Sequence, residues 1–328
     1  MKCFVTGATG FIGSRLVEKL LVEGHEINCL IRSPEKFVAF QGKHVHPIYG
    51  DLDNSTALLQ GCKDCDVVYH LAVYAKPWSK DPNLPYRINV QGTINILEAS
   101  LKSGVKKFIF TSTAAVFGPS SEDQCIDEQV IQNGPYFNDY ESTKALAEKS
   151  ALEFITRGLL VIILNPTRVF GPGPISESNS ITKIIKLYQK GKWRINPGDG
   201  KKIGNYVYID DVIEGHLLAA EKGTSGERYI LGGENLTFNQ LFQTLSQITG
   251  NKRLLLHIPV WLMIMLAKIM ELQVQVSGRP PLITPQWVKK YLHNWKLSSE
   301  KAINQLGYKI TPFNDGVMKT VTWLNNKK

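Results

Sequence analysis

A tyrosine and a lysine four residues apart, Tyr140 and Lys144, carry the most directly readable chemistry of this sequence. On a helix this spacing places the phenol and the ammonium group on one face, one turn apart. A free phenol has a pKa of about 10, too high for easy proton exchange at neutral pH. A nearby cation stabilises the phenolate, so we expect Lys144 to lower the pKa of Tyr140. Tyr140 can then give a proton to a carbonyl oxygen or take one from an alcohol.

Hydroxyl side chains end a predicted strand over residues 106–112, where the sequence runs Thr111, Ser112, Thr113. The carboxyl ends of parallel strands form the edge at which α/β proteins bind ligands. We therefore expect Thr113 to form a hydrogen bond with a substrate oxygen and to orient it. Surface tyrosine–lysine pairs and polar strand ends are both common. It is their occurrence together that indicates a catalytic site.

Glycines at positions 7, 10 and 13 follow the apolar run 3–5 and precede an amphipathic segment that begins at Phe11. A strand, a glycine-rich turn and a helix in this order form a site for the pyrophosphate of a dinucleotide. Gly7 permits the tight turn, Gly10 lets backbone N–H groups approach phosphate, and Gly13 lets the helix pack closely on the strand. The helix N-terminus adds partial positive charge and free N–H donors.

Strands and helices alternate through the first half of the chain. Alternation of this kind predicts a parallel sheet with helices on both faces, and right-handed crossovers make it doubly wound. The sequence therefore predicts an α/β fold of the Rossmann type with its ligand cleft at the carboxyl ends of the strands. The predicted strands are 2–6, 27–31, 45–49, 66–70, 106–112 and 159–164, and the predicted helices are 11–23, 54–60, 88–102 and 139–156.

The pattern changes after Pro166, where the Gly/Pro-rich stretch 171–174 breaks the alternation. An amphipathic segment follows at 181–189, then a strand at 206–209 and a helix at 212–221 that Asp210 can cap. The remainder is mostly helical, and we expect it to form a smaller substrate lobe over the cleft. The predicted domains are residues 1–166 with the returning segment 203–232 for the dinucleotide, and 167–202 with 233–328 for the substrate.

The composition of the 328 residues is that of a soluble globular protein, with 43% hydrophobic residues and a net charge of +9 that favours anionic ligands. Five cysteines, with one C-x-x-C at Cys62 and Cys65, argue against a disulfide framework and predict no metal site. No nucleic-acid motif is present. The apolar stretch 258–270 is too short to span a bilayer, which favours a buried or pocket-lining helix. A strand beginning at residue 2 predicts no secretory signal and a cytoplasmic location.

Taken together, residues 6–13, 111–118 and 140–144 resemble the extended branch of the short-chain dehydrogenase/reductase family, within the NAD-dependent epimerase/dehydratase superfamily. Residues 50–52, 70–72, 89–93, 165–172 and 208–212 match as well, so the resemblance covers most of the chain. It implies that Thr113 is the catalytic hydroxyl, that Tyr140 is the acid/base, and that Lys144 holds the nicotinamide ribose and tunes Tyr140. It also implies a homodimer formed through the helices that carry Asn89 and Tyr140.

Cofactor contacts are predicted from the glycine turn, the strand ends and this resemblance. The resemblance implies that Asp51 and Leu52 flank the adenine, that residues 71–73 line the dinucleotide, and that Asn89 has a structural or proton-relay role. The predicted cofactor-binding residues are Gly7, Thr9, Gly10, Phe11, Ile12, Gly13, Arg32, Lys36, Asp51, Leu52, Leu71, Ala72, Val73, Asn89, Thr111, Tyr140, Lys144, Pro166 and Val169.

The choice between the two nicotinamide cofactors depends on the end of the strand 27–31. A carboxylate there would bind the free 2′-hydroxyl of NAD, but this chain has Arg32, with Lys36 nearby. A guanidinium group suits a 2′-phosphate, so NADP(H) is favoured and NAD(H) is possible.

The reaction class is narrowed by neighbouring residues. Dehydratases of the family place an acidic pair after the catalytic hydroxyl, whereas this chain has Ala114 and Ala115. Sugar-nucleotide enzymes carry an arginine just before the strand at 206–209, where this chain has Gly204 and Asn205, although Lys201 and Lys202 are close. Residues 165–169 and 294–308 look like dihydroflavonol 4-reductase and its hydroxysteroid-dehydrogenase-like relatives.

The resulting prediction is an NAD(P)-dependent oxidoreductase that transfers a hydride between nicotinamide and a carbonyl or secondary alcohol of a small organic substrate. The alternatives are a nucleotide-sugar epimerase with tightly bound NAD and a non-catalytic dinucleotide-sensing protein. The substrate itself cannot be read, because residues 170–204 and 250–300 carry no interpretable motif.

Overall fold

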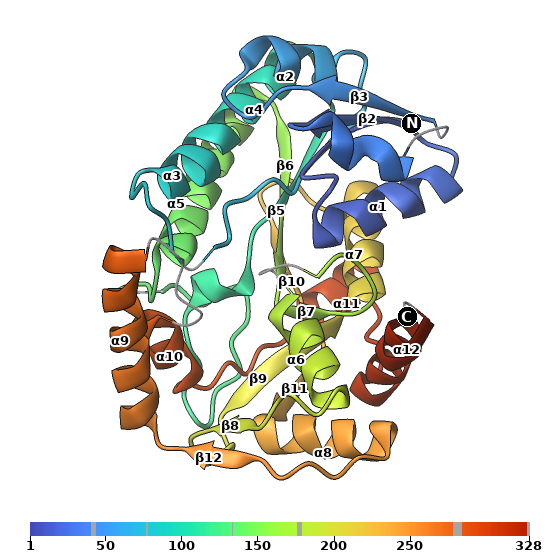
Figure 1. The fold of residues 1–328 in the computed structure, drawn as a ribbon. Helices are drawn as coiled ribbons and strands as arrows, with labels where there is room; N and C mark the ends of the chain where they lie inside the picture. Colours follow the sequence, from blue (N-terminus) through green and yellow to red (C-terminus); the bar gives the residue numbers. More distant parts are fainter. Residues whose placement is uncertain (41–43, 77, 133, 176–178, 278–283, 327–328) are drawn as a thin grey trace.

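A seven-stranded, fully parallel sheet is the framework of the computed structural model, which describes residues 1–40, 44–76, 78–132, 134–175, 179–277 and 284–326 (Figure 1). The strand order is β10-β6-β5-β4-β1-β2-β3. The chain adds strands outward in one direction from β1 and in the other direction from β4, as in a doubly wound sheet. The strands are β1 (Lys2–Thr6), β2 (Glu26–Ile31), β3 (Val45–Tyr49), β4 (Val67–His70), β5 (Lys107–Thr111), β6 (Leu160–Pro166) and β10 (Arg228–Leu231).

Helices cover both faces of this sheet, because alternate strand residues point to opposite sides. Cys3 and Val5 pack with α1 and α7, while Phe4 between them packs with α2, α4 and α5 on the other face. Figure 1 shows the two helix layers on either side of the strands. The doubly wound α/β fold is thus confirmed. The helices are α1 (Phe11–Val22), α2 (Ser55–Cys62), α4 (Gly92–Lys102), α5 (Asp139–Glu153) and α7 (Ile209–Lys222).

A second region lies beyond the carboxyl ends of the strands. It contains a three-stranded sheet, β11-β9-β7, and a two-stranded sheet, β12-β8. The strands are β7 (Arg168–Phe170), β8 (Ile195–Pro197), β9 (Ile203–Tyr208), β11 (Glu234–Thr237) and β12 (Leu256–Ile258). The helices are α6 (Ser180–Gln189), α8 (Phe238–Thr249), α9 (Val260–Ser277), α10 (Pro285–Tyr291), α11 (Glu300–Leu306) and α12 (Phe313–Asn326).

Two local predictions differ from the structure. Helix α7 begins at Ile209 with Tyr208 as its N-cap, so Ile209 is not a strand residue and Asp210 is not the cap. Asp210 lies in the first turn instead, and its carboxylate accepts a hydrogen bond from Arg15 at 2.9 Å. The predicted helix 88–102 is also divided, with α3 (Leu84–Tyr86) and a π-helical turn over Arg87–Gln91 preceding α4.

The apolar stretch 258–270 lies in α9 for most of its length. Trp261, Met265 and Ile269 are 67%, 44% and 44% exposed, so this face of the stretch is not buried. Ala267 is buried, and Glu271, one residue beyond the stretch, lines the main cavity. Among the described residues, no helix is both long and apolar enough to cross a membrane.

The cysteines have free thiols, and four of the five are buried. Cys3 and Cys29 are core residues. Burial raises the pKa of the Cys62 thiol to about 12 and that of Cys65 to about 11, and Cys62 ends α2 rather than lying in a loop. Protonated, buried thiols are poor nucleophiles and poor metal ligands, so a packing role is favoured for this pair.

Candidate functional site

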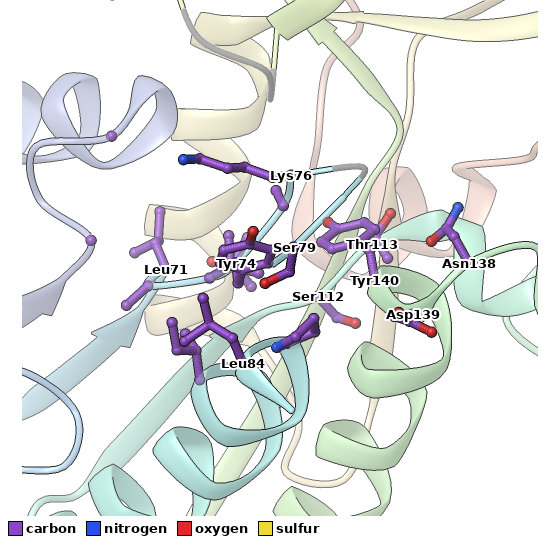
Figure 2. Close-up of a pocket in the computed structure, with 18 of the residues that line it drawn as sticks. Leu71, Tyr74, Lys76, Ser79, Leu84, Ser112, Thr113, Asn138, Asp139 and Tyr140 are labelled. Atoms are coloured by element: carbon purple, nitrogen blue, oxygen red, sulfur yellow. The ribbon is translucent and has the colours of Figure 1, made fainter. Parts of the chain in front are cut away.

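A cavity of about 1250 Å³ opens at the carboxyl edge of the parallel sheet. Its walls come from the glycine turn, the loops after β2, β4, β5 and β6, the start of α5, and residues of α6, α9 and α10. Figure 2 shows the part in which Tyr74 and Ser79 lie next to Tyr140 at the start of α5. The edge is the one at which the sequence predicts a ligand cleft.

The glycine turn has little room for side chains. Gly7 has a left-handed backbone, with φ of +74°, and a Cβ on it would lie 2.7 Å from the Ala72 nitrogen. A Cβ on Gly13 would lie 2.2 Å from the Gly7 carbonyl oxygen, so α1 packs directly against the turn. Since α1 begins at Phe11, its N-terminal N–H groups point toward the cavity edge that these residues line. The turn therefore fits the pyrophosphate of a dinucleotide.

Most of the predicted cofactor residues lie together on the cavity wall, whereas Asn89 and Lys144 do not line it. Lys36 belongs to a 3₁₀-helix over Pro34–Phe40, but its side chain lies outside the described structure. The predicted cofactor-binding and catalytic residues that line the cavity are Gly7, Thr9, Gly10, Phe11, Ile12, Gly13, Arg32, Asp51, Leu52, Leu71, Ala72, Val73, Thr111, Thr113, Tyr140, Pro166 and Val169.

Asn89 is a positioning residue in this geometry. It is 1% exposed, and its side-chain oxygen accepts a hydrogen bond from the Tyr74 backbone N–H at 2.7 Å. Its amide group donates to the Tyr74 carbonyl and to the Thr143 hydroxyl, at 3.1 and 2.9 Å. The side chain thus ties the loop after β4 to α5. The π-helical turn that carries it sets its position, and a sequence reading as plain helix misses this turn.

Tyr140 and Thr113 form the polar centre of the cavity (Figure 2). Burial raises the pKa of Tyr140 to about 12, and a hydrogen bond with Thr113 opposes the shift. The Thr113 oxygen accepts a hydrogen bond from the Ala115 N–H at 3.3 Å, which leaves its own proton free to be donated. Asn138 is the N-cap of α5, two residues before Tyr140, and so fixes where the helix that carries the phenol begins.

Lys144 contacts the end of β5. Its ammonium group donates to the Thr111 carbonyl at 2.7 Å and lies 4.0 Å from the centre of the Phe110 ring. Burial lowers the pKa of Lys144 to about 7, against the pull of the Glu148 carboxylate. In the free protein the pKa of Tyr140 lies above its ordinary value, because burial outweighs the opposing hydrogen bond with Thr113. The effect of Lys144 on Tyr140 stays a prediction.

A buried hydrogen-bond network holds the catalytic strand end. The Asn165 side chain donates to the Thr113 carbonyl at 3.1 Å and to the Glu148 carboxylate at 2.7 Å. Arg228 contacts the other Glu148 oxygen at 3.7 Å. Asn165 lies in one of the motifs that match the family, but the sequence indicates no role for it or for Glu148. Lys144 and Glu148 are four residues apart, a spacing that predicts a contact between their side chains on one face of α5.

Several cavity residues come from segments in which the sequence offered no motif. Tyr74, Lys76 and Ser79 follow β4. Figure 2 shows Tyr74 and Ser79 between Leu71 and Tyr140, whereas the Lys76 side chain extends away from Tyr140. Trp287, Lys290 and Tyr291 belong to α10, with Lys290 paired to the Glu141 carboxylate at 2.7 Å. These residues are brought to the site by tertiary packing, so spacing along the chain could not indicate them.

The chain is similar in sequence and in structure to proteins of a known family. A family model described as "NAD dependent epimerase/dehydratase family" matches residues 3–232. A putative dihydroflavonol 4-reductase of Synechocystis sp. is 31% identical over 98% of this chain and 94% of its own length. A 3beta-hydroxysteroid-dehydrogenase/decarboxylase (isoform 1) of Arabidopsis thaliana is 28% identical over 99% of this chain and 80% of its own length.

A solved structure of a UDP-glucose 4-epimerase from Thermotoga maritima, with UDP-glucose, has a TM-score of 0.82 and is 27% identical, covering 100% of this chain and 99% of that one. The matches span both the parallel sheet and the second region, in agreement with the resemblance drawn from the motifs. The chain belongs to the NAD dependent epimerase/dehydratase family.

Proposed function

We propose that the protein is an NADP(H)-preferring oxidoreductase that transfers a hydride between nicotinamide and a carbonyl or secondary alcohol of a small organic substrate, as dihydroflavonol 4-reductase-like enzymes do. Family membership and the named relatives establish the broader class, a nicotinamide-dinucleotide enzyme that acts on CH–OH groups. The observation that carries the proposal is the Thr113–Tyr140 pair, which shares one cavity with the glycine turn.

Tyr140, Thr113 and Lys144 have different roles in this reaction. A bound nicotinamide dinucleotide supplies or accepts the hydride. Since the pKa of Tyr140 is about 12, the phenol is protonated at neutral pH and can donate its proton to the oxygen of a carbonyl being reduced. Thr113 donates a hydrogen bond to the same oxygen and stabilises its developing negative charge. Lys144 holds the Thr111 carbonyl and so fixes the strand end that carries Thr113.

Cofactor preference is proposed from Arg32, which directly follows β2, is exposed and lines the cavity. We expect Arg32→Glu to raise the KM for NADPH by about 10- to 100-fold, because a carboxylate repels the 2′-phosphate that the guanidinium group binds. The KM for NADH should change little or fall. Steady-state kinetics with both cofactors gives the ratio, and an unchanged ratio would show that Arg32 does not read the 2′ position.

A substrate panel tests the proposed reaction. The purified protein is mixed with NADPH and aromatic, aliphatic and alicyclic ketones and aldehydes, and NADPH oxidation is followed at 340 nm while the alcohol product is identified. Stereospecific deuterium transfer from labelled NADPH to the product is the expected result. Absence of transfer across the panel, with cofactor binding intact, would favour a dinucleotide-sensing protein instead.

A nucleotide-sugar epimerase is the second candidate, supported by the fold similarity to the UDP-glucose 4-epimerase. An epimerase would retain NAD through purification and would interconvert UDP-glucose and UDP-galactose without added cofactor. The two candidates are separated by the cofactor that is released on denaturation and by the need for added NADPH. The homodimer, the cytoplasmic location and the division into the two predicted lobes remain predictions.

A further inference from the structure

Arg168 lies on the cavity wall that the three-stranded sheet provides. It begins β7 and pairs with Tyr206 of β9, whose hydroxyl accepts a hydrogen bond from the guanidinium group at 3.2 Å. The carbon of the guanidinium group lies 5.0, 5.5 and 5.7 Å from the ring centres of Tyr291, Tyr206 and Phe238. Aromatic rings on several sides hold the group in place by cation–π attraction.

The backbone leaves space for this arginine. A Cβ on Gly204 would lie 2.3 Å from Nη1 of Arg168, so a side chain at position 204 would collide with the guanidinium group. The sequence lacks an arginine of its own at the start of β9. The neighbouring strand β7 places Arg168 against Gly204, which spacing along the chain does not reveal.

The charge of Arg168 is not balanced by a carboxylate. Among the described residues no Asp or Glu forms an ion pair with it, whereas Lys290, the other cation on this wall, is paired to Glu141 at 2.7 Å. The two cations are close enough that Arg168 helps to lower the pKa of Lys290, after the larger effect of burial. A guanidinium group has five N–H donors, and only one of them meets an acceptor of the described protein.

We propose that Arg168 binds an anionic oxygen group of the substrate, a carboxylate or a phosphate, while the carbonyl or alcohol of the same molecule lies at Tyr140. This rests on the proposed function and deepens it by naming the substrate class. The planar donors of Arg168 suit bidentate binding of such a group, and the aromatic surround strengthens the interaction by excluding water. The apolar body of the substrate would then contact Trp287 and Tyr291.

The test compares matched acidic and neutral probes. For a 4-oxo-4-arylbutanoate and its primary amide, kcat/KM of NADPH oxidation is measured in the wild type, Arg168→Met, Arg168→Lys and a charge-matched control, Arg194→Met. Arg194 is exposed and lies outside the cavity wall. The wild type should favour the acid, and Arg168→Met should lower the acid-to-amide ratio by about 10- to 100-fold, the loss expected for a hydrogen-bonded ion pair. Arg168→Lys should retain part of the preference for the acid. Arg194→Met should keep the acid-to-amide ratio of the wild type.

Calorimetry on the NADP⁺-loaded protein decides the proposal even where neither probe is turned over. Dissociation constants are measured for the same acid, the amide and UDP, and preference for the acid or for UDP identifies the anion as carboxylate or diphosphate. Weaker binding of the preferred anion in Arg168→Met alone supports the proposal. Equal binding of anion and amide by the wild type, or a preference that survives Arg168→Met, overturns it. Absence of NADPH turnover with anion binding intact would count against the proposed reaction and not against the site.

Discussion

Replacing Tyr140 with phenylalanine is expected to lower the turnover number by about 100- to 10,000-fold, the range that a positioned acid/base group contributes. The phenol hydroxyl is the group hydrogen-bonded to Thr113 at the centre of the cavity. Phenylalanine keeps the ring but has no proton to give. Affinity for NADP(H) should stay within a few-fold of the wild type, because the glycine turn and the strand ends are untouched. Single-turnover kinetics and a fluorescence titration measure the two quantities.

Tyr136 offers the matched control. It is a second tyrosine on the wall of the same cavity, four residues before Tyr140, and it lies outside the helix that begins at Asp139. Tyr136→Phe removes the same atom from the same cavity and should leave turnover within a few-fold of the wild type. Equal losses in the two variants would mean that neither phenol has a special role. Full activity in Tyr140→Phe would end the proposed assignment.

Adding one methyl group at Gly13 is expected to reduce dinucleotide affinity by more than about 100-fold. The Cβ of an alanine would lie 2.2 Å from the Gly7 carbonyl oxygen, so α1 must move away from the turn. That movement withdraws the helix N-terminus from the cavity edge and overpacks the interface, at a cost of about 1–3 kcal/mol in unfolding free energy. Calorimetric binding of NADP⁺, together with the melting temperature of the free protein, measures both effects.

Gly134→Ala is the control for this substitution. A methyl group there would approach only the Gln132 side chain, at 3.8 Å, so stability and affinity should both remain those of the wild type. Gly10→Ala separates the two effects at the turn itself. Its Cβ would lie 3.1 Å from the Gly7 oxygen, a milder contact, so we expect weaker binding with a smaller loss of stability. Normal NADP⁺ affinity in Gly13→Ala would show that the turn does not hold the pyrophosphate.

Features encoded by neighbouring residues could be predicted from the sequence. The strands β1 to β6 lie within a few residues of their predicted ranges because apolar and β-branched runs directly report burial on both faces of a parallel sheet. The glycine turn follows from the spacing of three residues, and the structure shows the close contacts that the spacing implies at Gly7 and Gly13. Tyr140 and Thr113 were found in the same way.

Properties that depend on the surroundings of a side chain could not be predicted. The pKa of Tyr140 rises and that of Lys144 falls because both are desolvated, and desolvation arises from residues far apart in the sequence. Arg168 and Lys290 come to one cavity wall from positions more than a hundred residues apart. The predicted start of α7 is wrong because Asp210 has the chemistry of a cap but lies two residues after the actual N-cap, Tyr208.

The path of the chain between its two sheets limits how this protein can be recombined with its relatives. The chain leaves the seven-stranded sheet after β6, returns through α7 and β10, and leaves again for β11, while β10 pairs with β6 along Ile163 to Pro166. A gene fragment ending near residue 166 would lack the strand that covers β6 and the helix that packs on α1, and it would expose a new, apolar sheet edge. An exchange of substrate specificity by gene shuffling therefore has to transplant two separate stretches together, because a single crossover near residue 166 would set a foreign α7 and β10 against the native α1 and β6.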